Sequence, residues 1–141
     1  MGAELQPELW VGDTSAAVAF YERGFGATVE HRVGGPSDTD GVVQLSVQGA
    51  RFWVAATSDE LRRFSPLSIR GATARTLLVV DDPPSVADAA VAAGAELTSE
   101  VGEEHGWLLG RIVDPFGHEW EIGRPLGDWP PGRKVRSPET P

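Results

Sequence analysis

Two carboxylates stand on one face of a predicted hairpin near the end of the chain. Residues 111–123, RIVDPFGHEWEIG, are typical of two β-strands joined by a tight turn, since the Asp-Pro-Phe-Gly at 114–117 has the residues that turns favour. The alternation that follows places Glu119 and Glu121 on one face and Trp120 and Ile122 on the other. Such carboxylates either meet solvent or point into a cavity, where they could anchor an amine or accept a proton.

The composition excludes several kinds of protein. The 141 residues suffice for one domain, and the absence of cysteine excludes disulfides and thiolate metal sites and fits a reducing compartment. The first residues show no signal peptide and no apolar run long enough for a bilayer, so we expect a cytoplasmic protein with no membrane partner. The net charge of −9 argues against a nucleic-acid partner. That acidity either serves solubility alone or attracts a cationic ligand.

The predicted elements occur twice in the same order, β-α-β-β-β. Asp13 or Thr14 caps the first helix, which Gly24 and Gly26 end. The repeat offset is 68 residues, or 69 if Asp82 matches Asp13. We expect strands at 6–11, 27–33, 42–47, 51–55, 75–80, 95–101, 107–113 and 118–122, and helices at 15–23 and about 83–93.

This order divides the chain into four parts. Residues 1–58 form the first module and residues 74–126 the second. Residues 59–73 read as a linker, in which LRRF at 61–64 could form one helical turn. Residues 127–141 are rich in proline and predict an irregular tail.

Two such units in tandem resemble the vicinal oxygen chelate superfamily, which includes glyoxalase I, extradiol dioxygenases, fosfomycin-resistance proteins and bleomycin-resistance proteins. The similarity covers residues 6–126 and depends on the duplicated order, on VGD at 11–13, on Phe20-Tyr21 and on the closing DPFGHEWEI at 114–122. It implies an α+β fold in which tandem βαβββ modules form a curled mixed sheet around a shared cavity. It also implies a homodimer that covers the sheet edges.

The resemblance places the four metal-ligand positions of metal-dependent members on Gln6, Trp53, Arg75 and Glu121, with Ala74 in place of Arg75 under the other repeat offset. Only Gln6 and Glu121 could bind a metal ion. An indole offers no lone pair, and a guanidinium would repel the ion. We therefore predict no metal and no other cofactor.

Period-two alternation on four strands then predicts the cavity wall. The opposite faces are apolar and should meet the helices: Leu9, Val11, Phe52, Val54, Leu78, Val80, Trp120 and Ile122. The predicted ligand-binding residues, with Arg51 or Arg75 holding one carboxylate in place, are Gln6, Glu8, Trp10, Arg51, Trp53, Arg75, Glu119 and Glu121.

More ordinary structural roles are open for several of these residues. Arg75 and Glu121 could simply form an internal ion pair where the metal would stand. His118 is expected to hydrogen-bond locally beside its turn, and Glu103-Glu104-His105 to form a solvated loop. The sequence contains no nucleotide-binding, serine-hydrolase or metalloprotease motif.

Three functions remain open. The first is a metal-independent protein that sequesters a small aromatic or cationic compound, such as an antibiotic. The second is a lyase, isomerase or dioxygenase with a non-standard metal site, or with Glu121 as a general base whose pKa is raised by desolvation beside Trp53. The third is an interaction subunit with a vestigial pocket.

Overall fold

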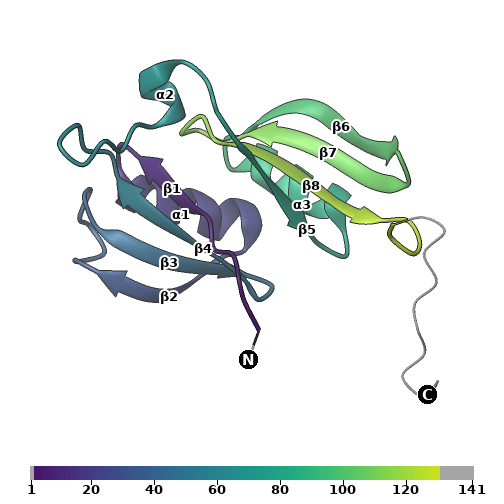
Figure 1. Cartoon of the computed structure of the whole chain (residues 1–141), viewed down its shortest axis with the longest axis horizontal. Coiled ribbons are helices and arrows are strands. Elements are labelled where there is room, and N and C mark those ends of the chain that lie inside the picture. The colour runs from purple at the N-terminus through teal and green to yellow at the C-terminus, as the bar shows by residue number, and fades with distance from the viewer. Residues whose placement is uncertain (1, 131–141) are drawn as a thin grey trace.

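Two βαβββ modules make up the computed structural model, which describes residues 2–130 (Figure 1). The first module contains β1 (Glu8–Val11), α1 (Thr14–Phe25), β2 (Thr28–Val33), β3 (Val42–Val47) and β4 (Ala50–Ala56). A linker with the short helix α2 (Pro66–Ile69) leads to the second module, which contains β5 (Arg75–Val79), α3 (Pro83–Ala92), β6 (Glu96–Glu104), β7 (Trp107–Val113) and β8 (Glu119–Pro125). Of the predicted irregular tail, residues 131–141 lie outside the described residues.

Each module forms one four-stranded mixed sheet. The strand orders are β1-β4-β3-β2 and β5-β8-β7-β6, and in each sheet the first pair is parallel and the others are antiparallel. The sheets lie side by side with α1 and α3 behind them, and these two helices pack against each other (Figure 1). The predicted α+β fold with tandem modules is confirmed.

The two long helices begin with equivalent aspartate caps. The carboxylate of Asp13 accepts a hydrogen bond from the Ala16 backbone N–H at 3.0 Å, and that of Asp82 accepts one from the Ser85 backbone N–H at 3.3 Å. The repeat offset is therefore 69 residues. This offset makes Arg75, not Ala74, the counterpart of Gln6.

Helix α1 is longer than its glycines predict. Gly26 ends it, with a φ of 68° that glycine adopts without strain, but Gly24 lies inside the helix. A Cβ atom on Gly24 would lie 3.4 Å from the Cα atom of Ala90 in α3. Gly24 therefore lies at the contact between α1 and α3, a position that the local sequence does not reveal.

The predicted apolar faces form the core. All eight side chains assigned to the helix-facing side of β1, β4, β5 and β8 are buried, from Leu9 to Ile122. Trp120 is only 2% exposed and lies among the rings of Tyr21, Phe25 and Phe52. The strand faces were therefore predicted in the correct register.

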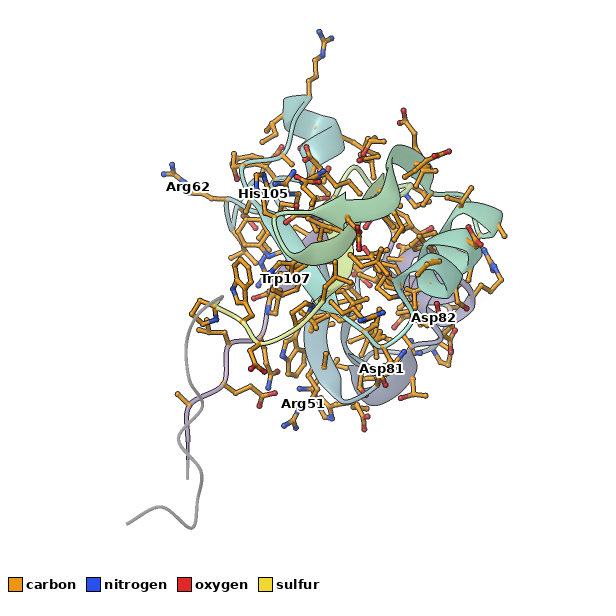
Figure 2. All side chains as sticks on the ribbon, turned by 90° about the vertical axis from the view of Figure 1, so that its right-hand side faces the viewer. Arg51, Arg62, Asp81, Asp82, His105 and Trp107 are labelled. Atoms are coloured by element: carbon orange, nitrogen blue, oxygen red, sulfur yellow. The ribbon has the colours of Figure 1, made fainter. Side chains whose placement is uncertain are left out.

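The linker and β6 differ from expectation. The helical turn predicted at 61–64 is wrong, because Arg62 has a φ of 59° and its side chain projects outward (Figure 2). A short helix forms instead at residues 66–69. Ser65 caps that helix and Pro66 occupies its first turn, which explains the displacement. Strand β6 continues to Glu104, so this residue is part of a strand and not of the solvated loop predicted at 103–105.

Among residues 2–130, no helix combines the length and the apolar character that crossing a membrane requires.

Candidate functional site

The sheet face of the first module carries a hydrogen-bonded group of two amides and one indole. Gln6 Oε1 accepts a hydrogen bond from Trp53 Nε1 at 2.8 Å and another from Gln44 Nε2 at 2.9 Å. Gln6 precedes β1 and is held in place because the adjacent Pro7 carbonyl accepts a bond from the Trp53 backbone N–H at 2.8 Å. Two predicted site residues, Gln6 and Trp53, are thus in direct contact, and Gln44 joins them.

These side chains belong to a row that crosses the whole sheet. Strand pairing aligns Glu8 with Trp53, Trp53 with Gln44, and Gln44 with His31. The imidazole of His31 meets the Trp53 indole edge-on, with 6.2 Å between ring centroids. Apart from Glu8 this row contains no carboxylate, guanidinium or ammonium group, and it offers a half-buried aromatic surface with amide groups beside it.

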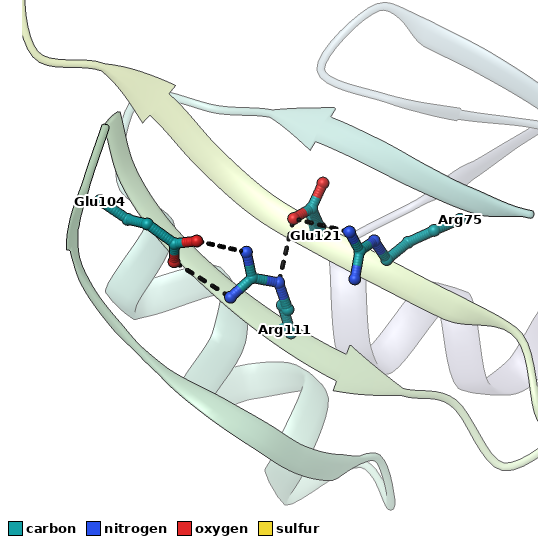
Figure 3. A network of polar contacts seen from close by, with 4 residues as sticks. All are labelled: Arg75, Glu104, Arg111 and Glu121. Atoms are coloured by element: carbon teal, nitrogen blue, oxygen red, sulfur yellow. Dashed lines mark hydrogen bonds and ion pairs between the residues drawn. The ribbon is translucent and has the colours of Figure 1, made fainter. Parts of the chain in front are cut away.

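The equivalent face of the second module carries charges instead (Figure 3). The Arg111 guanidinium makes two hydrogen bonds to the Glu104 carboxylate, at 2.8 and 3.0 Å, and its Nε donates to Glu121 Oε2 at 3.0 Å. The Arg75 guanidinium lies 3.4 Å from the same Glu121 oxygen. The Arg75–Glu121 ion pair, which the sequence left open as an alternative, is present as part of a larger network of two arginines and two glutamates.

Arg111 is the centre of this network. Its hydrogen bonds to Glu104 raise the pKa of the guanidinium, against the effect of burial. The same hydrogen bonds lower the pKa of the Glu104 carboxyl. These shifts of pKa favour the charged forms of Glu104 and Arg111, and Glu121 lies in contact with the guanidiniums of Arg111 and Arg75.

Arg51 takes no part in either group. It forms an ion pair with Glu4 at 3.0 Å, and the two side chains are 48% and 45% exposed. Its guanidinium points away from the body of the molecule (Figure 2), and Arg51 lines a pocket of about 260 Å³ with Glu4, Pro7 and Leu77 among others. Of the two arginines expected to hold a cavity carboxylate, Arg75 does so and Arg51 does not.

A second pocket, of about 210 Å³, lies at the seam between the modules. Glu8 and Trp10 of the first module and Glu119 of the second line it, and the linker covers it through Phe64 and Ile69 among others. No lysine or arginine is among its lining residues. Three predicted site residues thus come together here, apart from the Gln6–Trp53 and Arg75–Glu121 groups.

His118 connects the two modules at this seam. Its backbone N–H donates to Asp114 Oδ1 at 3.0 Å, as expected for a residue beside the turn. Its ring Nε2, however, lies 2.8 Å from the carbonyl oxygen of Trp10. The expectation of purely local bonding is therefore wrong for the side chain.

The residues present do not fit a metal ion of the kind that the resemblance implies. Trp53 uses its only polar atom to hydrogen-bond Gln6, and Arg75 places a fixed cation beside Glu121. Glu121 is the only carboxylate among the four positions, and a hard divalent ion needs several oxygen or imidazole ligands. Within residues 2–130, no group of three or more His, Cys, Asp or Glu side chains is placed to hold a metal.

We expect the purified protein to contain no stoichiometric divalent metal, because two of the four ligand positions cannot bind one. Elemental analysis of protein purified without chelators would measure this. About one Zn, Ni, Mn or Fe per chain, lost on Glu121→Ala, would contradict the expectation.

Three residues of these groups were not among those predicted: Gln44, Arg111 and Glu104. Gln44 lies directly opposite Trp53 in its hairpin, and Arg111 lies directly opposite Glu121. Because the length of a hairpin turn decides which residues face each other, a correct turn length would have indicated both residues. Glu104 offered no such signal, because the strand that carries it was expected to end before Gly102.

The fold and the two sheet faces define a protein of two βαβββ modules, each with a four-stranded mixed sheet, in which two of the four expected metal-ligand positions cannot bind a metal. The chain belongs to the Glyoxalase/Bleomycin resistance protein/Dioxygenase superfamily, whose model matches residues 5–122. This membership and the predicted resemblance agree.

Several individual proteins are similar to this chain over most of its length. An uncharacterized protein of Mycobacterium bovis, Mb0911c, is 29% identical over 126 residues, which cover 86% of this chain and 83% of the relative. The structure of a gene product from Arabidopsis thaliana has a TM-score of 0.67 and 29% identity, covering 88% of this chain and 100% of that one. A bleomycin-binding protein complexed with bleomycin has a TM-score of 0.63 at 20% identity, covering 87% of this chain and 98% of that one, and shows the shared fold.

Proposed function

We propose that this protein binds a small organic molecule without a metal ion and sequesters an aromatic or cationic compound, such as an antibiotic. The observation that carries this proposal is the occupation of the metal-ligand positions. Trp53 is hydrogen-bonded to Gln6, and Arg75 is paired with Glu121. These contacts replace a metal site by an aromatic surface and a fixed charge network, which are means of holding an organic ligand.

The seam pocket supports the cationic part of the proposal. Within residues 2–130, the side-chain carboxylates of Glu8 and Glu119 form no hydrogen bond or ion pair, and the indole of Trp10 lies in the same pocket. Unpaired carboxylates beside an indole suit an ammonium group, which both the charges and the aromatic face attract. A structural relative described as a bleomycin-binding protein gives precedent on this fold for retaining an antibiotic.

Catalysis by a lyase, isomerase or dioxygenase mechanism is the alternative. It would need a non-standard metal site or Glu121 as a general base. The pairing of Glu121 with Arg111 and Arg75 favours the binding function, because these guanidiniums engage the carboxylate that would accept the proton.

Binding of a cationic ligand should depend on Trp10, the indole of the seam pocket. A thermal-shift panel of aromatic ammonium compounds, bleomycin included, would be compared with aromatic carboxylates of similar size. We expect the ammonium compounds to raise the melting temperature more, and Trp10→Ala to weaken the best of them at least about tenfold, because a stacking indole contributes about 2 kcal/mol or more. Equal shifts from both classes, or unchanged affinity in Trp10→Ala measured by calorimetry, would contradict the proposal.

We also expect a homodimer. The first and last strands of each sheet order, β1, β2, β5 and β6, are edge strands, and on β5 the side chains of Leu77 and Val79 are 42% and 53% exposed. A second copy would cover such edges and close the open sheet faces. Light scattering at micromolar concentration should give twice the chain mass of 15.0 kDa. A species of the single-chain mass alone would contradict the expectation.

A further inference from the structure

The amides of Gln6 and Gln44 each retain one polar atom that the protein does not use. An indole N–H can only donate, so the atom that receives Trp53 Nε1 must be the oxygen of Gln6. The same oxygen accepts from Gln44 Nε2, which fixes the orientation of the second amide. What remains is a donor, Gln6 Nε2, and an acceptor, Gln44 Oε1.

Both remaining atoms are accessible from outside the protein. Neither makes a hydrogen bond to another described residue. The one buried side-chain nitrogen or oxygen without a partner in residues 2–130 is Trp10 Nε1, so neither remaining atom of Gln6 and Gln44 is buried. This donor and this acceptor can therefore form hydrogen bonds with water or with a ligand.

The surroundings define what kind of ligand could use this pair. Gln44 and Trp53 are directly opposite each other on β3 and β4, so the amide atoms lie at the side of a half-buried indole. No guanidinium or ammonium group takes part in this cluster, in contrast to the second module, where Arg75 and Arg111 dominate. A flat, neutral group with its own adjacent acceptor and donor complements such a surface.

We propose that the first module recognises a planar lactam or cyclic imide through Trp53, Gln6 and Gln44. The ligand carbonyl accepts from Gln6 Nε2, its ring N–H donates to Gln44 Oε1, and its face stacks on the indole. A ring amide holds its C=O and N–H on the same side, so both bonds form at once. This inference rests on the proposed ligand-binding function and narrows the aromatic ligand to one hydrogen-bonding class.

The test compares 2-pyridone, which has the ring N–H, with N-methyl-2-pyridone, which lacks it. The five tryptophans give indole N–H signals in a proton–nitrogen NMR spectrum, and the signal lost in Trp53→Phe identifies Trp53. Titration of the full chain with 2-pyridone should shift this signal to saturation. N-methyl-2-pyridone should bind at least about tenfold more weakly. It lacks the ring N–H, so Gln44 Oε1 would lose its hydrogen-bond partner when this compound binds.

Two variants test the role of the amides. Gln44→Leu keeps the size of the side chain but removes the acceptor, so the difference between the two pyridones should disappear. Gln48→Asn changes an exposed glutamine in the turn of the same hairpin and should preserve the difference.

Three outcomes would overturn the inference: equal affinity for both pyridones, no shift of the Trp53 signal with either, or discrimination that persists in Gln44→Leu. The broader binding function is judged separately by the ammonium panel and Trp10→Ala. A protein that binds an ammonium compound through Trp10 but does not distinguish the pyridones would retain the function and lose the lactam assignment.

Discussion

Replacing Trp120 by alanine is expected to lower the free energy of unfolding by about 3–5 kcal/mol. The side chain is only 2% exposed and packs edge-on against Phe25 and Phe52, with ring centroids at 4.8 and 5.5 Å. Its indole N–H also donates to Asp114 Oδ2 at 3.0 Å, so the substitution removes a buried hydrogen bond together with the packing. Urea denaturation monitored by circular dichroism would measure the loss.

Trp53→Ala is the matched control for this prediction. Trp53 is also a tryptophan on the strand parallel to its module's first strand, but it lies on the open sheet face and is partly exposed. Its removal should cost much less stability while affecting ligand binding. If Trp120→Ala melted normally and Trp53→Ala unfolded, Trp53 and not Trp120 would belong to the core face. This result would contradict the assignment of the site to the face of Trp53.

The sequence predicted these faces because the side chains alternate on the strands nearest the module boundaries. The alternation of polar or indole side chains with apolar ones is clearest on β1 and at the start of β8, where a slip of one residue would have buried Glu119 and Glu121. The duplicated helix caps Asp13 and Asp82 add a second, independent marker of register. Fold and core could therefore be predicted from local patterns.

The partners of the site residues could not be predicted in the same way, because they depend on turn length and strand length. The sequence suggested a three-residue turn at 48–50, but the structure has a two-residue turn at Gln48-Gly49, with positive φ at both, and this places Gln44 opposite Trp53. Glu104 reaches Arg111 only because β6 continues through Gly102 with irregular pairing.

The splitting of the expected cavity has a similar cause. Gln6, Glu8 and Trp10 alternate correctly, but the chain places Gln6 against Trp53 and turns Glu8 and Trp10 toward the linker at the seam. Arg51 is drawn away by Glu4, which lies outside the predicted elements. The linker and other segments without a periodic pattern decide which inward-facing residues share a cavity. The alternation along the strands carries no information about the course of those segments.

Asp114→Ala is expected to destabilise the protein by about 3–5 kcal/mol, because this buried carboxylate is the common acceptor of four groups. Asp114 is 3% exposed. It accepts from the Tyr21 hydroxyl, from Trp120 Nε1 and from the backbone N–H groups of Phe116 and His118 at 2.9 and 3.0 Å. Without it, buried donors of α1, of the turn and of β8 would lose their partner together.

Tyr21 connects this carboxylate to the first module. Burial raises the pKa of the Tyr21 phenol well above its usual value, and the negative charge of Asp114 raises it further, so the hydroxyl keeps its proton and donates. Because the pKa of Tyr21 is higher in the folded protein than in the unfolded chain, the protonated phenol stabilises the folded state fully at a pH below the unfolded-state pKa of about 10. This contribution to the free energy of unfolding is lost as the pH rises above that value. Tyr21→Phe should therefore flatten the alkaline end of the stability profile.

Conservative variants separate the loss of the Asp114 hydrogen bonds from the loss of side-chain volume. Tyr21→Phe removes one donor and should cost about 1–2 kcal/mol, while Asp114→Asn keeps one acceptor oxygen and should cost less than Asp114→Ala. Urea denaturation of the single and double variants gives the coupling between Tyr21 and Asp114, which we expect to be clearly favourable. If Asp114→Ala cost no more than Tyr21→Phe, the carboxylate would not organise the turn.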